Sequence, residues 1–390
     1  MEKYAEFLSQ VRSELTDDIL PFWTGRMQDG KGGFYGRMDG TGRLVPDAPR
    51  GGILTARLLW TFSSAYRMFG GESVLEAASH AYAQIRDRFY DPEFGGTYWS
   101  IDACGNPLET KKQYYAIAFA VYGLAEYYRA TGEKPALDLA VKLYKDIESH
   151  SLDPVRGGYL EAASRDWSPI ADMRLSERDR NDAKTMNTHL HILEGYTGLY
   201  RVWPDEGLRR SLAGLVELFL GRIVRPDGHL GLFFNEDWES QSDAVSYGHD
   251  IESSWLLCET AQVLGDEALT ARVRECSARL ADAAAEGLRP CGGMIYEYDP
   301  ASGALDDSYQ WWVQAETVVG CLNQYRLRGD GVWLERALRA WNFIRTSLLC
   351  PDGEWYWSVT ADGTPNTADD RAGFWKCPYH NGRMCMEILA

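Results

Sequence analysis

The sequence predicts an all-α fold, a single-domain (α/α)6 barrel of six helical hairpins spanning residues 1–390, with short β-hairpin loops on one rim. Three observations predict this fold. Apolar residues recur with helical spacing in twelve segments, a phrase of glycines and aromatic residues recurs six times between them, and the first and last helices have only each other as hairpin partners. A near-constant period of this kind is typical of repeat architectures.

The glycine-aromatic phrase defines the repeat. It recurs at intervals of 61 to 71 residues and begins at Gly32, Gly95, Gly157, Gly228, Gly292 and Gly353. An Asp or a Pro usually stands just before it, as at Asp91 and Pro92. Gly and Pro mark turns, and the alternating apolar residues that follow indicate short strands.

Helices are expected between the phrases, because apolar residues there recur every three or four positions, as at Ala118, Val121, Tyr122 and Ala125. The segments lie near residues 3–18, 52–69, 73–90, 112–131, 135–150, 184–202, 206–223, 247–264, 267–287, 309–328, 331–347 and 378–389. Connections within a hairpin are mostly short and polar. Connections between hairpins are long, and each carries one glycine-aromatic phrase.

The two ends of the chain favour a closed ring over an open superhelix. The helix at 3–18 has no partner before it and the helix at 378–389 has none after it, so their pairing completes six hairpins. The helices that follow the long loops then form the inner ring. Long loops are usually functional, and all of them fall on one rim, so the site is expected there.

Composition and charge exclude several classes of function. The net charge of −17 repels phosphate backbones, so nucleic acid and anionic membranes are poor partners. No apolar run is long enough to span a bilayer and the N-terminus has no apolar signal core, so a cytoplasmic protein, taken as a monomer, is expected. The eight cysteines form no CxxC pair and are expected to be reduced, buried thiols. Many of the 14 Trp and 22 Tyr residues fall in loops, where aromatic rings suit the flat apolar faces of sugars.

Polar and aromatic side chains gather at the start of all six inner helices, where they face the mouth of the barrel. They are Arg57, Tyr115, Asn187, His191, His249, Glu252, Trp311, Trp312, Gln314, Glu316 and His380. This convergence is the strongest functional signal in the sequence.

The histidines among these residues indicate proton transfer. His189 and His191 point in different directions on a helix, and Asn187, one turn earlier, selects His191 as the inward one; His189 is expected to be a packed structural residue. His249 and Glu252 are three apart on one helix face, close enough to hydrogen-bond. The carboxylate raises the basicity of the imidazole and the helix N-terminus lowers it, so a pKa near neutrality is expected for His249, as general acid/base catalysis requires.

Other chemistries match the sequence less well. HExxH, GxGxxG, P-loop and GxSxG patterns are absent, so no metal and no cofactor is expected. Glycoside hydrolysis needs two carboxylates that flank the bond, and Asp179, Asp250, Glu252 and Glu316 are candidates near the mouth. Histidine, however, suits proton transfer at carbon better than protonation of a leaving group.

Several segments resemble the cellobiose 2-epimerases, a branch of the N-acylglucosamine 2-epimerase superfamily. They are residues 46–51 with 56–60, 186–194, 246–252, 311–316 and 375–383. The resemblance runs from about residue 10 to the C-terminus. It implies reversible, cofactor-free epimerisation at C2 of the reducing-end glucose of β-1,4-linked disaccharides through a cis-enediolate. Cellobiose would give glucosyl-mannose, and lactose would give epilactose.

The resemblance also implies roles for individual residues. It places the acid/base pair on His249 and His380, assigns His191 to ring opening or to holding the enediolate, and assigns Arg57 to the negative charge on the C1–C2 oxygens. The residues expected to bind substrate are Tyr115, Asn187, Asp179, Glu252, Trp312 and Trp375. The doubled tyrosine at 114 and 115 leaves open which ring faces inward.

Three alternatives belong to other classes. A mannose or aldose–ketose isomerase would use the same scaffold and the same enediol but would return the proton to C1. An (α/α)6 glycoside hydrolase is a less favoured alternative. A non-catalytic sugar-binding protein would need the tryptophans but not the histidines.

Overall fold

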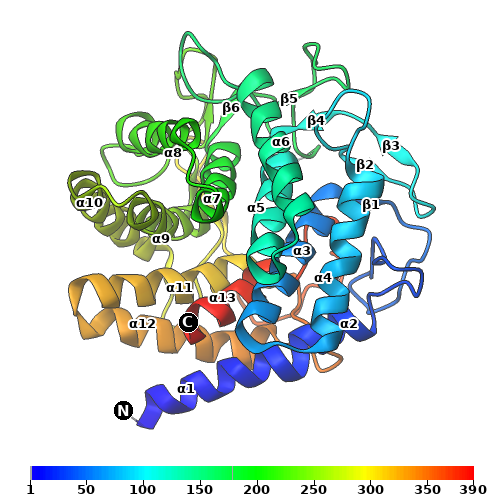
Figure 1. The fold of residues 1–390 in the computed structure, drawn as a ribbon. Helices are drawn as coiled ribbons and strands as arrows, with labels where there is room; N and C mark the ends of the chain where they lie inside the picture. Colours follow the sequence, from blue (N-terminus) through cyan, green and yellow to red (C-terminus); the bar gives the residue numbers. More distant parts are fainter. Residues whose placement is uncertain (1, 178) are drawn as a thin grey trace.

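The inner ring is closed as predicted. The structure, a computed structural model, describes residues 2–177 and 179–390. The inner helices are α3 (Gly52–Phe69), α5 (Tyr114–Thr131), α7 (Met186–Val202), α9 (Tyr247–Leu264), α11 (Trp311–Arg328) and α13 (Tyr379–Leu389). Each packs against the next, and α13 packs against α3, which completes the (α/α)6 ring (Figure 1).

The outer helices surround this ring. They are α1 (Glu2–Ser13) with α2 (Leu20–Gly25), α4 (Glu72–Gln84), α6 (Lys134–His150), α8 (Glu206–Leu218), α10 (Glu267–Ala284) and α12 (Gly331–Phe343). Wider π-helical turns extend several of them, at Ile85–Phe89, Phe219–Ile223 and Ile344–Leu348. The first and last helices pack together, because α1 lies against α13 (Figure 1).

The first helical segment runs further than predicted. A π-helical turn at Glu14–Ile19 joins α1 to α2, so the helical segment ends at Gly25 rather than near residue 18. Pro21 lies just after this turn. Because proline has no backbone N–H, it cannot donate a hydrogen bond to the carbonyl one turn earlier, and the π-helical turn lies directly before this missing bond. Phe22 and Trp23 are buried, so packing rather than propensity extends the helix.

Burial distinguishes the two rings. In α3 every side chain from Gly52 to Ala65 is buried, whereas α8 buries only Leu208, Leu212, Leu215 and Val216 on one face. A helix that is apolar all round belongs in a core, and an amphipathic one covers it. The inner helices approach closely at glycines: a Cβ at Gly123 would lie 2.7 Å from the carbonyl oxygen of Ala56.

The repeated glycines begin tight turns near the ends of the outer helices. All six have positive φ, between 75° and 101°, which glycine adopts without steric cost. Backbone bridges close the turns, for example from Tyr90 to Thr97 and from Leu152 to Tyr159. The recurring phrase is therefore a conformational requirement of each repeat.

Short antiparallel strands line the rim that carries the long loops. The pairings are β1 (Arg50–Gly51) with β2 (Ser100–Ile101), β2 with β3 (Pro107–Glu109), β4 (Lys112–Gln113) with β5 (Ala162–Ala163), β6 (Lys184–Thr185) with β7 (Phe233–Phe234), β8 (Val245–Ser246) with β9 (Glu297–Asp299), β9 with β10 (Ala304–Asp306), and β11 (Tyr309–Gln310) with β12 (Ser358–Val359). Hairpins form at β2–β3 and β9–β10. In the other pairings a strand of one long loop pairs with a strand of the next loop. The sequence predicted only hairpins within single loops.

Two further expectations concern the whole chain. The eight cysteines are free thiols, and Cys104 and Cys291 are exposed rather than buried. Within residues 2–177 and 179–390, no helix combines the length and the apolar character that crossing a bilayer requires.

Candidate active site

A cleft opens at the N-terminal ends of α7 and α9. His249 and Ser246 line it from the start of α9, Asn187 lines it from the start of α7, and Asp179 lines it from the preceding loop. The Oδ1 atom of Asn187 is buried and has no hydrogen-bond partner among the described residues. Asp179 accepts hydrogen bonds from the backbone N–H and the hydroxyl of Ser176, which fixes its carboxylate at the cleft wall.

His249 connects this cleft to a deeper group of predicted residues. Its imidazole lies 4.7 Å from the ring of Trp312, and the same indole lies 5.7 Å from the ring of His380, measured between centroids. The two histidines come from α9 and α13, on different walls of the barrel. They are therefore brought to one place by the fold, as the sequence predicted.

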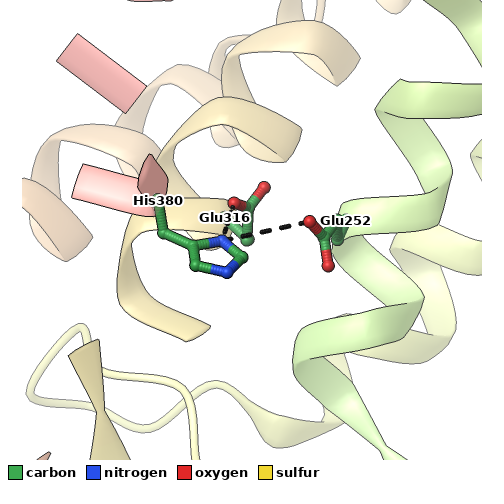
Figure 2. Close-up of side chains that lie close together, drawn as sticks. All are labelled: Glu252, Glu316 and His380. Atoms are coloured by element: carbon green, nitrogen blue, oxygen red, sulfur yellow. Dashed lines mark hydrogen bonds and ion pairs between the residues drawn. The ribbon is translucent and has the colours of Figure 1, made fainter. Parts of the chain in front are cut away.

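His380 is held by a buried charge network (Figure 2). Its Nδ1 lies 2.7 Å from Oε1 of Glu316. Arg383 donates from Nη2 to the same oxygen at 2.6 Å and to Oε1 of Glu252 at 2.7 Å. With Nδ1 donating to a carboxylate, Nε2 is the ring nitrogen that can accept a proton. In Figure 2 the imidazole and the two carboxylates converge on one point in the barrel.

Burial controls the ionisation of this network. It lowers the pKa of His380 to about 3, against the opposing influence of Glu316. Burial would raise the pKa of Glu316, but Arg383 and His380 overcome it and hold that pKa at about 2. Burial and the nearby Glu316 raise the pKa of Glu252 well above its usual value. His380 is thus a neutral imidazole backed by an ionised carboxylate.

His191 has a similar carboxylate partner. Its Nδ1 lies 2.9 Å from Oε2 of Glu194, and the other oxygen of Glu194 accepts hydrogen bonds from Tyr379 and Arg383. Arg383 therefore contacts the carboxylates behind both His191 and His380. Burial is the main cause that lowers the pKa of His191, and Glu194 opposes it.

The expected pairing of His249 with Glu252 is wrong. The Nδ1 atom of His249 instead lies 2.7 Å from the hydroxyl oxygen of Ser246, and Glu252 bonds to Arg383. The expected pKa near neutrality is wrong as well. Burial, with smaller contributions from His191 and His380, lowers the pKa of His249 to about 3. The guanidinium of Arg383, from α13, binds the carboxylate of Glu252 instead. Spacing within α9 cannot predict a contact with another helix.

Arg57 lies among aromatic rings. It donates from Nη2 to the Tyr115 hydroxyl at 2.7 Å and from Nη1 to the carbonyl of Trp375 at 3.3 Å. Its guanidinium stacks 4.3 Å from the ring centroid of Phe119 and 4.9 Å from that of Tyr379. The side chain is buried, so its charge is shielded from bulk water.

Tyr115 is the inward member of the doubled tyrosine. Its ring lies 4.9 Å from that of His191 and 6.2 Å from that of Trp375. Tyr114 donates instead to the backbone carbonyl of His150, on an outer helix. The question that the sequence left open is settled by which helix each ring contacts.

Two other residues near the mouth have structural partners. Both ring nitrogens of His189 are hydrogen-bonded: Nδ1 lies 2.6 Å from the carbonyl oxygen of Thr185, and Nε2 accepts from the backbone N–H of Tyr159 at 2.8 Å. His189 is therefore a packed residue, as predicted. Asp250, a candidate carboxylate for hydrolysis, is buried and lies 2.7 Å from Nδ1 of His229. Asp250 therefore faces away from the histidine cluster.

Sequence reasoning missed Glu194 and Arg383 as site residues. Each stands three positions after an inward histidine on its helix, Glu194 after His191 and Arg383 after His380, which is the spacing that places side chains on one face. That spacing is the signal that could have found them. Their importance comes from contacts between helices far apart in the sequence.

The carboxylates around His380 have the composition of a cation site. Candidate ligand atoms of Glu252, Glu316 and His380 lie within 4.8 Å of one another. Arg383, however, already donates to both carboxylates. The guanidinium supplies the positive charge that a divalent ion would bring, and such an ion would have to displace it.

Comparison with known proteins identifies the class of this barrel. Residues 33–381 match the family model of N-acylglucosamine 2-epimerase (GlcNAc 2-epimerase). The chain belongs to this family, and it is an isomerase that acts on carbohydrates.

Several relatives that match along almost their whole length are cellobiose 2-epimerases. The chain is 55% identical to a cellobiose 2-epimerase of Bacteroides fragilis, over 98% of this chain and 99% of the relative, and 41% identical to one of Ruminococcus albus, over 98% of each. The structure of a cellobiose 2-epimerase from Bacillus thermoamylovorans is 41% identical and superimposes with a TM-score of 0.94, covering 99% of both chains. A D-mannose isomerase structure at 19% identity shares the fold, with a TM-score of 0.85.

Proposed function

We propose that the chain reversibly epimerises C2 of the reducing-end glucose in β-1,4-linked disaccharides, converting cellobiose to glucosyl-mannose and lactose to epilactose without a cofactor. The observation that carries this proposal is the meeting of His249 and His380 against Trp312, each with Nδ1 already bonded. The relatives at 55% and 41% identity, both named cellobiose 2-epimerase, support the substrate class.

The reaction begins with the open-chain aldehyde. His191, oriented by Glu194, is suited to move the proton that opens the ring. The aldehyde acidifies the hydrogen at C2, and a neutral imidazole removes it as a general base. The depressed pKa values of His249 and His380 support this role, because both rings are unprotonated at neutral pH.

Removal of the proton leaves a cis-enediolate, whose negative charge lies on the C1–C2 oxygens. Arg57 is the cationic donor suited to that charge, because it is buried and held in place by Tyr115 and Trp375. A fixed donor in a water-poor site stabilises developing charge far more than one in bulk solvent. His191, whose ring lies against that of Tyr115, is the second group assigned to holding the enediolate.

Epimerisation then requires a proton on the opposite face of C2. Rotation about C2–C3 can turn that face toward the imidazolium just formed, or the second histidine can protonate C2 from the other wall. The low pKa values of both histidines favour rotation, because the second ring holds no proton at neutral pH. In either route the proton removed from C2 is balanced by one returned, so no oxidant or reductant is needed.

Substrate binding is assigned to the remaining predicted residues. The Oδ1 atom of Asn187, which has no hydrogen-bond partner within residues 2–177 and 179–390, and the carboxylate of Asp179 both line the cleft and suit sugar hydroxyls. Glu252 and Tyr115 would bind hydroxyls deeper in the barrel. Trp312 and Trp375 offer flat faces for stacking against the sugar rings.

Product analysis tests the proposal. Purified protein incubated with cellobiose or with lactose should yield the 2-epimer of each, resolved by chromatography against standards, while the His380→Asn variant yields none. A ketose as the main product would instead indicate an aldose–ketose isomerase, and free glucose would indicate a glycoside hydrolase. Recovery of unchanged disaccharide would overturn the proposal.

A further inference from the structure

Three histidines of the inner helices, His191, His249 and His380, are fixed in the same way but by different partners. In each the Nδ1 atom is bonded: to Glu194 for His191, to Glu316 for His380, and to Ser246 for His249. A carboxylate stabilises an imidazolium by its charge, whereas a hydroxyl carries no charge and can either donate to Nδ1 or accept from it. His249 is therefore chemically distinct from the other two.

Ser246 occupies a position where its hydroxyl would ordinarily serve the backbone. It is the N-cap residue of α9, and serine there usually accepts a hydrogen bond from a free N–H of the first helical turn. In the described structure its side chain makes no such bond. Thr185, the N-cap residue of α7, does cap its helix and accepts from the N–H of Thr188. The hydroxyl of Ser246 is thus diverted from the helix to the imidazole.

The surroundings of His249 leave Ser246 as the residue that orients the ring. Trp312 of α11 packs against the face of the imidazole, but it offers no hydrogen bond to Nδ1 in the described structure. The titratable groups that act on His249 are His191 of α7, Glu316 of α11 and His380 of α13. Ser246 is 2% exposed, so water does not readily take the place of its hydroxyl.

We propose that Ser246 is a positioning residue for proton transfer: its hydroxyl fixes the ring of His249 so that Nε2 faces the cleft, and it does so without placing a negative charge beside the imidazole. The kinetic consequence rests on the proposed function, in which His249 is one of the acid/base pair. The structural consequence, a fixed ring orientation with Nδ1 hydrogen-bonded, does not.

Three substitutions at Ser246 test the kinetic consequence. Ser246→Ala should lower kcat by about 10- to 100-fold with little change in KM, because a misoriented catalytic group loses rate rather than binding. Ser246→Thr, which keeps the hydroxyl, should recover most of the rate. Ser246→Asp should move the acid limb of the kcat profile to higher pH, because a carboxylate raises the pKa of the imidazole and the base is protonated earlier as pH falls.

A matched control separates this role from a general effect on α9. Ser254, on the same helix, donates its buried hydroxyl to the carbonyl of Ile251, outside the histidine cluster. Ser254→Ala should keep the wild-type kcat and pH profile. Wild-type kcat and pH profile in Ser246→Ala, or an equal loss of kcat in Ser254→Ala, would overturn the proposal. If Ser246→Ala does not fold, Ser246→Thr and Ser246→Asp decide it by the same criteria.

A measurement without substrate tests the structural consequence. Imidazole ¹⁵N chemical shifts, with the signals of His249 assigned by comparison with His249→Asn, should differ between the wild type and Ser246→Ala, because the variant lacks the hydrogen bond at Nδ1. Unchanged shifts would overturn the proposal. If the wild-type protein epimerises neither cellobiose nor lactose, the proposed function fails, and this measurement still supports or refutes the role of Ser246.

Discussion

Replacing Arg383 by methionine should destabilise the fold strongly at neutral pH. Its guanidinium contacts Glu194, Glu252 and Glu316, all fully buried, and no solvent can replace it. Removing one partner of a buried ion pair costs about 3–5 kcal/mol, which is a large part of the roughly 5–15 kcal/mol that holds a typical protein folded. The pKa of Glu316 gives a second measure, for Arg383 and His380 together: its fall from 4.5 to about 2 corresponds to roughly 3 kcal/mol.

The loss of unfolding free energy in Arg383→Met should also depend on pH, and the pKa values of the buried carboxylates determine whether it grows or shrinks. In the wild type the depressed pKa of Glu316 contributes stability above its unfolded value of 4.5, and this contribution is lost as the pH falls toward 2. Without Arg383 the buried carboxylates have raised pKa values, so the variant gains stability as the pH falls from 8 to 5. The gap between the two proteins should therefore narrow over that range.

Urea unfolding at pH 7.5 and at pH 5, followed by tryptophan fluorescence and far-UV circular dichroism, measures this gap. Arg272→Met is the control, because Arg272 pairs with Glu217 on the surface, where both side chains are about half exposed, and its loss should cost less than about 1 kcal/mol. An Arg383→Met variant within about 1 kcal/mol of the wild type at pH 7.5, or a gap equal at both pH values, would refute the reasoning.

Three further predictions concern activity. His249→Asn and His380→Asn should each abolish epimerisation while leaving the circular dichroism spectrum unchanged; a near-wild-type rate in either removes that residue from the acid/base pair. Tyr115→Phe should lower kcat by about tenfold, because it removes the hydroxyl that holds the guanidinium of Arg57, whereas Tyr114→Phe should leave kcat unchanged. Equal effects of the two substitutions in steady-state assays would contradict the assignment of the inward ring. The profile of kcat/KM should show no histidine limb near pH 6.5, because burial lowers the pKa of His249 and of His380, the proposed acid/base pair, to about 3. An inflection near pH 6.5 would show that these histidines titrate as exposed imidazoles do.

The sequence predicted the barrel because its signals are long and local. Helical spacing persists over whole segments, and the glycines that begin each turn need positive φ, so both features are visible without tertiary information. Helix starts were wrong by two residues at 112, 184 and 309, because each of those helices is preceded by a two-residue strand, at Lys112–Gln113, Lys184–Thr185 and Tyr309–Gln310. Apolar spacing does not distinguish such a short strand from the first turn of a helix.

The sequence predicted that His191, His249 and His380 come together, but it did not predict their hydrogen-bond partners. They come together because each lies in the first turns of an inner helix, which sequence position reveals. Glu252 was assigned to His249 on spacing alone, yet it bonds to Arg383, 131 residues further along the chain. Which buried group binds a given carboxylate depends on distances between helices, and the sequence does not contain these distances.

The measurement that tests the central claim most directly is the fate of the hydrogen at C2. After turnover of cellobiose in D2O to equilibrium, mass spectrometry and proton NMR should find solvent deuterium at C2 of both the glucose and the mannose epimer, because an imidazole proton exchanges with solvent. Epimers formed with C2 hydrogen fully retained and no solvent deuterium would contradict transfer through His249 and His380, and would require a hydride or carbon-skeleton route instead.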